Sequence, residues 1–411
     1  MNSLISLLFS SFSGVVVEKI VGALAAIASN HLFANIYGAR LFGELQFALS
    51  LAYVVGSAAL IFSSQAVAPI IGKHPRLRHM VFYRTFRLRL TSTFSVMFLF
   101  MAVVALFMQS SSVALTLIAG LVLLVEPIAL GSLMAYAETK PWVITRAKAY
   151  ASGVRVLWLL GAAHASVGAI VASFAWPLEA CVAAVAPFSR YRSLALQPPK
   201  SLLGDATVTK TLIVRGLKLW PAIAAGVLVL RMDRLLLGTL MSKTDLGIYA
   251  AAASLVEQWN SVGGTLALAL APTMVYAARN ELQLRSNALK LGAYLAVVAV
   301  VAWIGSLFVG HRIFMLIYGP AFEAGVPVMI FATACSIVTF ADAGLTTWIV
   351  AARRYRLVMM KQALTVAAIA VAPFVMPRSL MMYSPATGTT VALVIFWCAT
   401  YGHTVFGRGR A

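Results

Sequence analysis

Long apolar runs separated by short polar links occupy almost the whole chain. Reading them as stretches bounded by charge, Gly or Pro predicts about twelve spans. They lie near residues 14–37, 43–71, 91–108, 113–137, 147–163, 167–188, 212–241, 246–277, 289–309, 325–351, 358–376 and 387–406. A helix needs about 20 mostly apolar residues to cross a hydrocarbon core of about 30 Å. The pattern therefore predicts an all-α membrane protein with about twelve transmembrane helices.

Composition favours a membrane fold over a soluble one. The 411 residues are 61% hydrophobic and only 11% charged, whereas soluble domains are about 25% charged. The three cysteines, Cys181, Cys335 and Cys398, are far apart and fall within apolar spans. Neither a disulfide framework nor a zinc site is indicated by that placement.

The basic residues gather in alternate links, so the net charge of +20 does not point to nucleic acid. One set of links holds Lys73, Arg76, Arg78, Arg84, Arg87, Arg89, Lys140, Arg146, Lys148, Arg190, Arg192, Lys200, Lys210, Arg215, Lys218, Arg279, Arg285, Lys290, Arg353, Arg354, Arg356, Lys361, Arg408 and Arg410. The opposite links offer only Arg40, Lys243, Arg312 and Arg378. The positive-inside rule then places both termini and every even-numbered link in the cytoplasm. We predict a multi-pass inner (plasma) membrane protein with no nucleic-acid partner.

The two halves of the chain share a repeat. Phe42-Gly43, Ser50-Leu51 and Ala68-Pro69 correspond to Leu246-Gly247, Ser254-Leu255 and Ala271-Pro272 at an offset of about 203 to 204 residues. Since each half holds six predicted spans, the copies have the same orientation, and the axis relating them runs along the membrane normal. We predict an N-lobe at 1–198 and a C-lobe at 199–411, each with six helices and joined by a linker around residues 197–200.

No motif for enzymatic chemistry occurs in the sequence. It has no nucleophile elbow, no phosphate-binding glycine loop and no His/Cys/Asp cluster at metal-ligand spacing. The longest link on the predicted outer side is also short, whereas membrane enzymes that build sugar polymers usually present a large outer loop. We therefore expect no enzyme, no catalytic residue, no metal and no cofactor.

The charged cluster Arg231-Met232-Asp233-Arg234 interrupts an apolar span. On a helix, Arg231 and Arg234 are three residues apart and share a face, so their guanidinium groups could bracket a diphosphate, which Arg binds bidentately. Asp233 could modulate that site or exchange an ion. In the simpler interpretation Asp233 neutralises one Arg and the cluster only pins the helix. We favour the binding role because one acid leaves one cation over.

Two further cations occupy apolar spans in the first half. Lys19 has a role comparable to the Arg cluster, although Glu18 is adjacent and a lysine near a helix end commonly extends its amine to the interface. Arg155 carries the same ambiguity. Both are candidates, with Arg231 and Arg234, for binding a substrate diphosphate.

Four carboxylates, Glu126, Glu179, Glu257 and Asp342, lie in or near spans. Carboxylates at such positions usually carry proton or sodium coupling in secondary transporters. For any single one we favour structural pairing with Arg155 or Lys19, but we expect at least one to take part in coupling. Asp233, Glu126, Glu257 and Asp342 are the coupling or charge-modulating candidates. Pro127 after Glu126 predicts a kink.

Motifs at three places resemble a known family. They are Asn35 to Gly43 continuing through Phe47 to Leu51, Gln65 and Pro69; Arg231 to Gly238 with Leu246 to Ala250 and Pro272; and Tyr318-Gly319 with Ala321-Phe322 and Val326-Pro327. The chain is similar in these motifs to polysaccharide (O-antigen type) flippases of the multidrug, oligosaccharidyl-lipid and polysaccharide exporter superfamily.

The resemblance implies two pseudo-symmetric six-helix lobes around a central cavity that opens alternately to either side. It implies that undecaprenyl diphosphate-linked oligosaccharide moves from the cytoplasmic to the outer leaflet for surface polysaccharide biosynthesis. The implied partners are this substrate, membrane lipids, a coupling proton or sodium ion, and enzymes of polysaccharide assembly. In this family cationic cavity residues often hold the diphosphate, and Lys19, Arg231 and Arg234 fit that role.

Two other functions remain open. A cation-coupled multidrug exporter of the same superfamily would need an anionic cavity for cationic drugs, and Asp233 would matter more than Arg231. A polytopic glycan polymerase or ligase would form glycan product from two lipid-linked donors.

Overall fold

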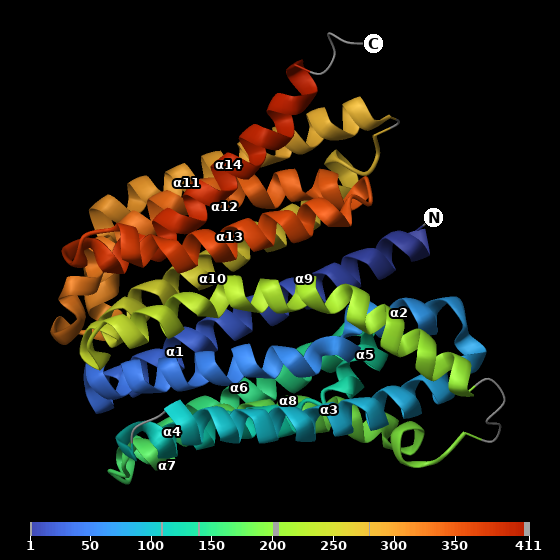
Figure 1. The fold of residues 1–411 in the computed structure, drawn as a ribbon, viewed down its shortest axis with the longest axis horizontal. Helices are drawn as coiled ribbons and strands as arrows, with labels where there is room; N and C mark the ends of the chain where they lie inside the picture. Colours follow the sequence, from blue (N-terminus) through green and yellow to red (C-terminus); the bar gives the residue numbers. More distant parts are fainter. Residues whose placement is uncertain (1, 108–109, 139, 200–204, 279, 407–411) are drawn as a thin grey trace. The chain divides into compact units, whose positions relative to one another are not determined.

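The protein is all-α, as predicted (Figure 1). The structure is a computed structural model that describes residues 2–107, 110–138, 140–199, 205–278 and 280–406, and these residues include no strand. They form two compact units, residues 1–227 and 228–411. The basic residues Lys200, Arg279, Arg408 and Arg410 lie outside the described residues, as does the side chain of Gln65.

The first unit contains the helices before residue 228. They are α1 (Asn2–Gly56), η1 (Ser57–Phe62), α2 (Ser64–Lys73), η2 (Pro75–Leu77), α3 (Arg78–Phe107), α4 (Ser110–Gly120), η3 (Leu121–Val125), α5 (Leu130–Ala137), α6 (Pro141–His164), α7 (Ala169–Ser173), α8 (Ala175–Leu196) and the first part of α9 (Asp205–Leu240). Buried side chains of α2, α3, α5, α8 and α9 form one of its apolar clusters.

The second unit contains the rest of α9 and the helices that follow. These are α10 (Lys243–Met274), α11 (Glu281–Tyr318), η4 (Pro320–Gly325), α12 (Val326–Ala351), α13 (Tyr355–Val375), η5 (Arg378–Tyr383) and α14 (Ser384–Phe406). α11 and α12 approach each other closely where Gly344 lies against the backbone of Gly292. Phe340 and Trp348 of α12 are fully buried in the apolar cluster of this unit.

Each predicted span lies largely within these helices. Nine stretches of described residues have the length and composition of a membrane span, and the first of them, Val17–Lys73, contains most of the first predicted span and all of the second. Gly38 separates those two, because its φ of 79° breaks α1 and glycine adopts positive φ without a steric cost. Predicted spans five and eight correspond to α6 and α10, which are not among the nine stretches. The number twelve therefore stays a prediction.

Two spans of the first unit are interrupted. The second predicted span passes from α1 into the 3-10 helix η1 before α2 begins. The fourth passes from α4 into η3 and irregular turns at 126–129, where Pro127 was expected to kink the chain. Backbone carbonyls freed at such breaks need other donors.

The link after the second predicted span is shorter than the basic residues suggested. α3 begins at Arg78, so most of the basic segment 74–90 is continuous with the third span. Arg89 is buried there, although its charge placed it in a link. Lys148, Lys210 and Lys361 likewise lie within helices.

Repeat-related positions have similar environments in each unit. Phe42 and Leu246 are both fully buried, and Ser50 and Ser254 are both buried. The break at Gly38 and the helix-capping Ser242 are separated by the repeat offset. These positions have the same burial class in both units, whereas Ala68 is half-buried and its counterpart Ala271 is buried. The division into two six-helix lobes stays a prediction.

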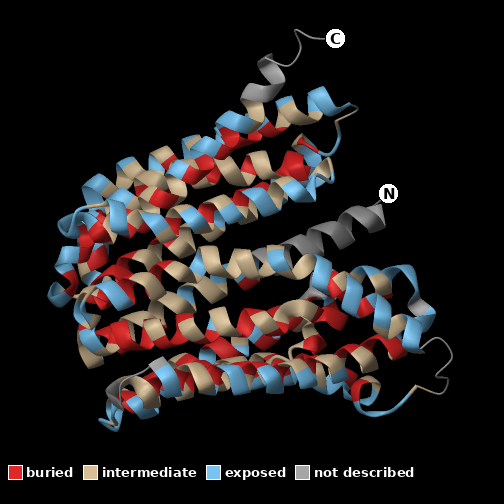
Figure 2. Cartoon of the chain, in the orientation of Figure 1, coloured by how far each residue is buried: buried red, intermediate tan, exposed pale blue. Residues whose placement is uncertain are grey.

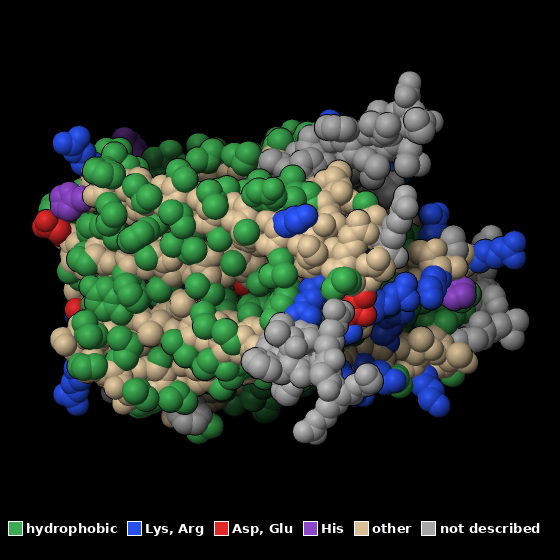
Figure 3. Space-filling model, turned by 90° about the horizontal axis from the view of Figure 1, so that it is seen from above, with side chains coloured by type: hydrophobic (Ala, Val, Ile, Leu, Met, Phe, Trp, Pro, Cys, Tyr) green, Lys and Arg blue, Asp and Glu red, His purple; other side chains and the backbone are tan. Residues whose placement is uncertain are grey.

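The surface is rich in large apolar side chains. Phe98, Phe308 and Leu316 are each more than three quarters exposed. Figure 2 shows buried positions alternating with exposed ones along the helices. In Figure 3, hydrophobic side chains cover broad areas of the face in view. Apolar surface of this extent would be unfavourable in water and suits contact with lipid.

Candidate functional site

The charged cluster predicted on α9 forms one site with α10. Arg234 Nη2 lies 2.8 Å from Oε1 of Glu257, and Arg231 Nη1 lies 3.7 Å from Oε2 of the same carboxylate. The Arg234 side chain is 1% exposed, whereas those of Arg231 and Glu257 are 27% and 26% exposed. Glu257 thus faces two guanidinium groups, of which only that of Arg231 is accessible.

Asp233 uses a different partner. Tyr249 on α10 donates a hydrogen bond from its hydroxyl to Asp233 Oδ2 at 2.6 Å. Asp233 Oδ1 is buried without a hydrogen-bond partner among the described residues, and so are Nε and Nη1 of Arg234. Buried polar atoms without partners are costly, and the described residues do not supply a partner for any of these three atoms.

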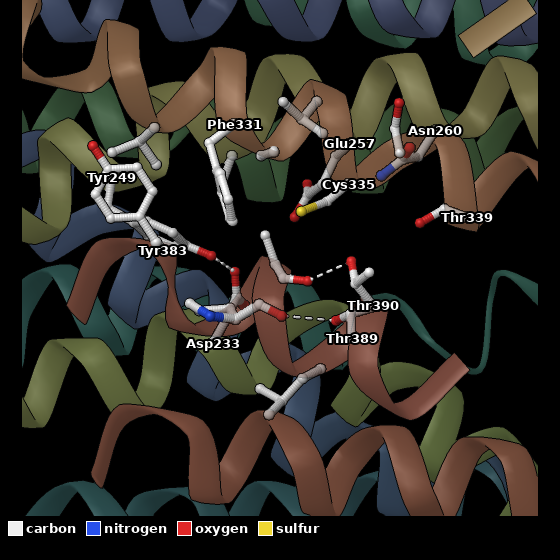
Figure 4. A pocket seen from close by; sticks show the side chains of 18 of the residues that line it. Asp233, Tyr249, Glu257, Asn260, Phe331, Cys335, Thr339, Tyr383, Thr389 and Thr390 are labelled. Carbon is white, nitrogen blue, oxygen red and sulfur yellow. Dashed lines mark hydrogen bonds between the residues drawn. The ribbon is translucent and has the colours of Figure 1, made fainter. Parts of the chain in front are cut away.

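A pocket of about 210 Å³ opens beside these side chains within the second unit (Figure 4). Asp233, Glu257 and Asn260 contribute oxygen-bearing side chains to its wall, and Phe331 and Tyr383 contribute rings. Asn260 Oδ1 is another buried oxygen without a partner among the described residues. Arg231 and Arg234 do not line it.

The lining sets the chemistry that this pocket can support. Carboxylate, amide and hydroxyl oxygens suit water, a proton or a small cation. No group of three or more His, Cys, Asp or Glu side chains suitable for a metal occurs in the part of the chain that the structure describes. At about 210 Å³ the pocket is below the 300 to 1,000 Å³ typical of sites for drug-sized ligands.

Arg155 lies in a separate, paired environment in the first unit. Its Nε donates to Ser29 Oγ at 2.7 Å, and its Nη1 contacts the Glu179 carboxylate. Ser152 Oγ donates to the same carboxylate at 3.2 Å. Arg155 is itself buried. This arrangement joins α1, α6 and α8 and matches the structural alternative considered for Arg155 and Glu179.

Lys19 is not neutralised by its neighbour Glu18. The Glu18 carboxylate is buried and contacts Lys148 Nζ of α6, and Tyr136 of α5 donates to it at 3.3 Å. Lys19 itself is exposed. Sequence adjacency suggested the wrong partner for Glu18, because residues next to each other on a helix point in different directions.

Glu126 is paired with a residue that the sequence assigned to a link. Arg89 Nη1 lies 3.7 Å from Glu126 Oε2. Arg89 also donates to the carbonyls of Phe62 and Glu126 at 2.8 and 3.2 Å. Arg89 therefore satisfies carbonyls at both interrupted spans of the first unit. It lies two residues before the predicted third span, so its charge assigned it to the link and gave no signal for this role.

Asp342, which is half-buried, forms an ion pair with the buried Lys361. Both of its carboxylate oxygens lie 2.8 Å from Lys361 Nζ. The structure thus brings Arg231, Asp233, Arg234 and Glu257 together and gives Lys19, Arg155, Glu126 and Asp342 separate surroundings. Lys148, Arg89 and Lys361 were missed as partners because each was counted as a loop charge.

Comparison with solved structures identifies the fold. A multidrug resistance MATE family transporter of the MOP superfamily, in an inward-facing conformation, matches with a TM-score of 0.66 and 13% identity over 96% of this chain and 99% of that one. The lipid II flippase MurJ in an inward closed conformation matches with a TM-score of 0.69 and 10% identity over 95% and 87%. The chain has the fold of these transporters.

A further match is the MATE multidrug transporter DinF-BH, with a TM-score of 0.59 and 14% identity over 96% of this chain and 95% of that one. No protein-family profile and no curated protein matches the sequence. At these identities the comparison shows a shared fold. That fold, together with the nine apolar stretches among the described residues, indicates a multi-pass membrane protein.

Proposed function

We propose that this protein flips undecaprenyl diphosphate-linked oligosaccharide from the cytoplasmic to the outer leaflet of the inner membrane by alternating access. The observation that carries the proposal is the exposure of Lys19 within an apolar span while the neighbouring Glu18 is bound by Lys148. A cation in such a span needs a counter-charge or water. An anionic headgroup supplies the former.

Arg231 is the second residue that we assign to the diphosphate. Its guanidinium is partly exposed and lies 3.7 Å from Glu257, whereas Arg234 makes the shorter contact. An arriving phosphate would compete with Glu257 for Arg231 while Arg234 holds the carboxylate in place. Arg234 would then position Glu257 without touching the headgroup. Arg155 is enclosed by Ser29 and Glu179 and would not reach the headgroup in this state.

The coupling ion is assigned to the pocket of the second unit. Asp233, Glu257 and Asn260 present oxygens there, two of which lack partners among the described residues. A proton or a sodium ion would bind in this pocket and reset the carrier. Glu126 and Asp342 receive less support as coupling sites because neither lines this pocket.

The membrane potential favours this direction of movement. Each charge that crosses gains about 2.3 kcal/mol per 100 mV, so an outside-positive potential drives an anionic diphosphate outward. The lipid tail stays in the bilayer, and the protein needs to shield only the headgroup from hydrocarbon. Contact with polysaccharide assembly enzymes would supply and remove this substrate.

The test uses purified protein in liposomes that contain the lipid-linked oligosaccharide in both leaflets. A membrane-impermeant glycosidase reports the fraction of headgroups that reach the outside. We expect the wild type to expose nearly all headgroups, and Lys19→Ala and Arg231→Ala to slow the exposure at least tenfold. Lys290→Ala, a change at an exposed lysine of α11, is the control. Wild-type protein that leaves the inner headgroups protected would refute the proposal.

A cation-coupled multidrug exporter is the second candidate. Its support is the pocket that combines Asp233 and Glu257 with the rings of Phe331 and Tyr383, since carboxylates and aromatic faces attract organic cations. At about 210 Å³ this pocket would hold the charged end of a drug and not the whole molecule. Efflux of a cationic dye that survives Arg231→Ala and is lost in Asp233→Asn would favour this function. If the protein is instead a flippase, Arg231→Ala should lose more activity than Asp233→Asn in the liposome flippase assay.

A further inference from the structure

A buried lysine in the second unit has the surroundings of a bound cation. Lys361 Nζ of α13 lies 2.8 Å from each carboxylate oxygen of Asp342 on α12 and 2.6 Å from Thr346 Oγ1. An ammonium group has three N–H donors, and these three oxygens accept them. The Lys361 side chain is 9% exposed. Its charge is therefore held by oxygens and not by water.

The carboxylate is fixed independently of the lysine. Trp397 of α14 donates from Nε1 to Asp342 Oδ1 at 2.8 Å. The Trp397 ring also lies under the ammonium, with Nζ 6.0 Å from its centroid. Thr346 lies one helical turn after Asp342 on the same helix face. The oxygens that surround Nζ are thus positioned by α12 and α14, whereas α13 contributes the cation.

This arrangement is distinct from the pocket assigned to the coupling ion. None of Asp342, Thr346, Lys361 and Trp397 lines that pocket. Asp342 was a candidate for ion coupling in the sequence, where its partner was not apparent. In the structure its charge is balanced within the chain.

We propose that Asp342, Thr346 and Trp397 form a binding site for a primary ammonium group, and that Lys361 is its permanent, covalently attached ligand. The site then needs no free metal ion, and the second unit carries its own cation through the transport cycle. This inference goes beyond the proposed function, and it holds whether the protein transports a lipid-linked oligosaccharide or a cationic drug.

Replacing Lys361 by Ala removes Cγ, Cδ, Cε and Nζ, which is the atom set of n-propylammonium. The experiment measures thermal unfolding of purified Lys361→Ala protein in n-propylammonium chloride and in tetramethylammonium chloride of equal concentration. Tetramethylammonium has the same charge and no N–H donor. We expect n-propylammonium to raise the melting temperature by about 5 to 10 °C over tetramethylammonium, as a ligand of the folded state does.

Two controls separate site binding from general salt effects. Asp342→Asn/Lys361→Ala lacks the carboxylate, and Lys290→Ala keeps the site intact; neither should distinguish the two salts. If folded Lys361→Ala protein can be purified in n-propylammonium chloride but not in tetramethylammonium chloride, that result would also support the site. Equal melting temperatures of Lys361→Ala in the two salts, or its recovery in neither, would overturn the proposal.

Discussion

Glu257 of α10 holds Arg234 of α9 at 2.8 Å and Arg231, one helical turn earlier, at 3.7 Å. One carboxylate thus organises both guanidinium groups of the cluster, but only Arg234 is fully enclosed. Because the Arg234 guanidinium is removed from water, its positive charge depends on Glu257 for stabilisation. The contact to Arg231 is longer and reaches the surface, so it is the one that we propose a substrate replaces.

The first prediction concerns Glu257→Gln. The amide keeps the size of the side chain but leaves the charge of Arg234 without its partner, so we expect a loss of about 3 kcal/mol in the free energy of unfolding. Thermal unfolding in detergent measures it. Glu281→Gln is the matched control, because Glu281 is exposed and its pair with Arg354 should contribute at most about 1 kcal/mol. Equal losses of unfolding free energy in Glu257→Gln and Glu281→Gln would contradict the burial of Arg234 beside Glu257.

The second prediction separates two lysines near Glu18. Lys148→Met removes the partner of a buried carboxylate, so we expect about 2 kcal/mol of destabilisation. Lys19→Met changes an exposed side chain and should alter stability by less than about 0.5 kcal/mol. Melting temperatures measure this difference, and Lys148→Met should melt below Lys19→Met. In the flippase assay the order should reverse, with Lys19→Met the more damaging; greater loss of flipping in folded Lys148→Met would argue against the role of Lys19.

The apolar pattern was sufficient to predict the helices, because lipid requires every spanning backbone to satisfy its own hydrogen bonds. It could not show where a span is broken. Phe62 lies in an apolar run that looks continuous, yet its carbonyl is free to accept from Arg89. Such breaks depend on a donor supplied from a helix distant in sequence.

The clustering of Arg231 and Arg234 could be predicted because residues three apart on a helix lie on the same face. Their shared partner Glu257 could not, since it is supplied by tertiary packing of α9 against α10. The same holds for Lys361, whose position near Arg353 and Arg354 suggested a loop. Sequence gives the charges, whereas helix packing decides which of them are enclosed.

The third prediction is a pH dependence at Glu138, which follows α5 outside the spans. Its carboxylate accepts hydrogen bonds from Lys140 at 2.9 Å and Tyr191 at 3.0 Å. The Lys140 hydrogen bond is the main cause that lowers the pKa of Glu138 below 4.5, with help from Tyr191 and the charge of Arg78 and against the effect of burial.

A pKa that is lower in the folded than in the unfolded state stabilises the fold above the unfolded value of 4.5. This contribution is lost as the pH falls through the folded pKa. We therefore expect wild type to melt at a higher temperature than Glu138→Gln at pH 7, with a difference that shrinks below about pH 4.5. A difference that stays constant from pH 7 to strongly acidic pH would exclude this linkage.

The fourth prediction tests the contact between α11 and α12. A Cβ added at Gly344 would lie 2.5 Å from the backbone nitrogen of Gly292, and a backbone atom cannot move aside as a flexible side chain can. Gly344→Ala should therefore force the helices apart and cost about 1 to 3 kcal/mol. Gly305→Ala on α11 is the control, because nothing lies within 4 Å of the added Cβ. Alanine is also the better helix former by about 1 kcal/mol, so Gly305→Ala should melt at or above the wild-type temperature. If Gly344→Ala melts as high as Gly305→Ala, the close approach of the two helices is not as the structure describes it.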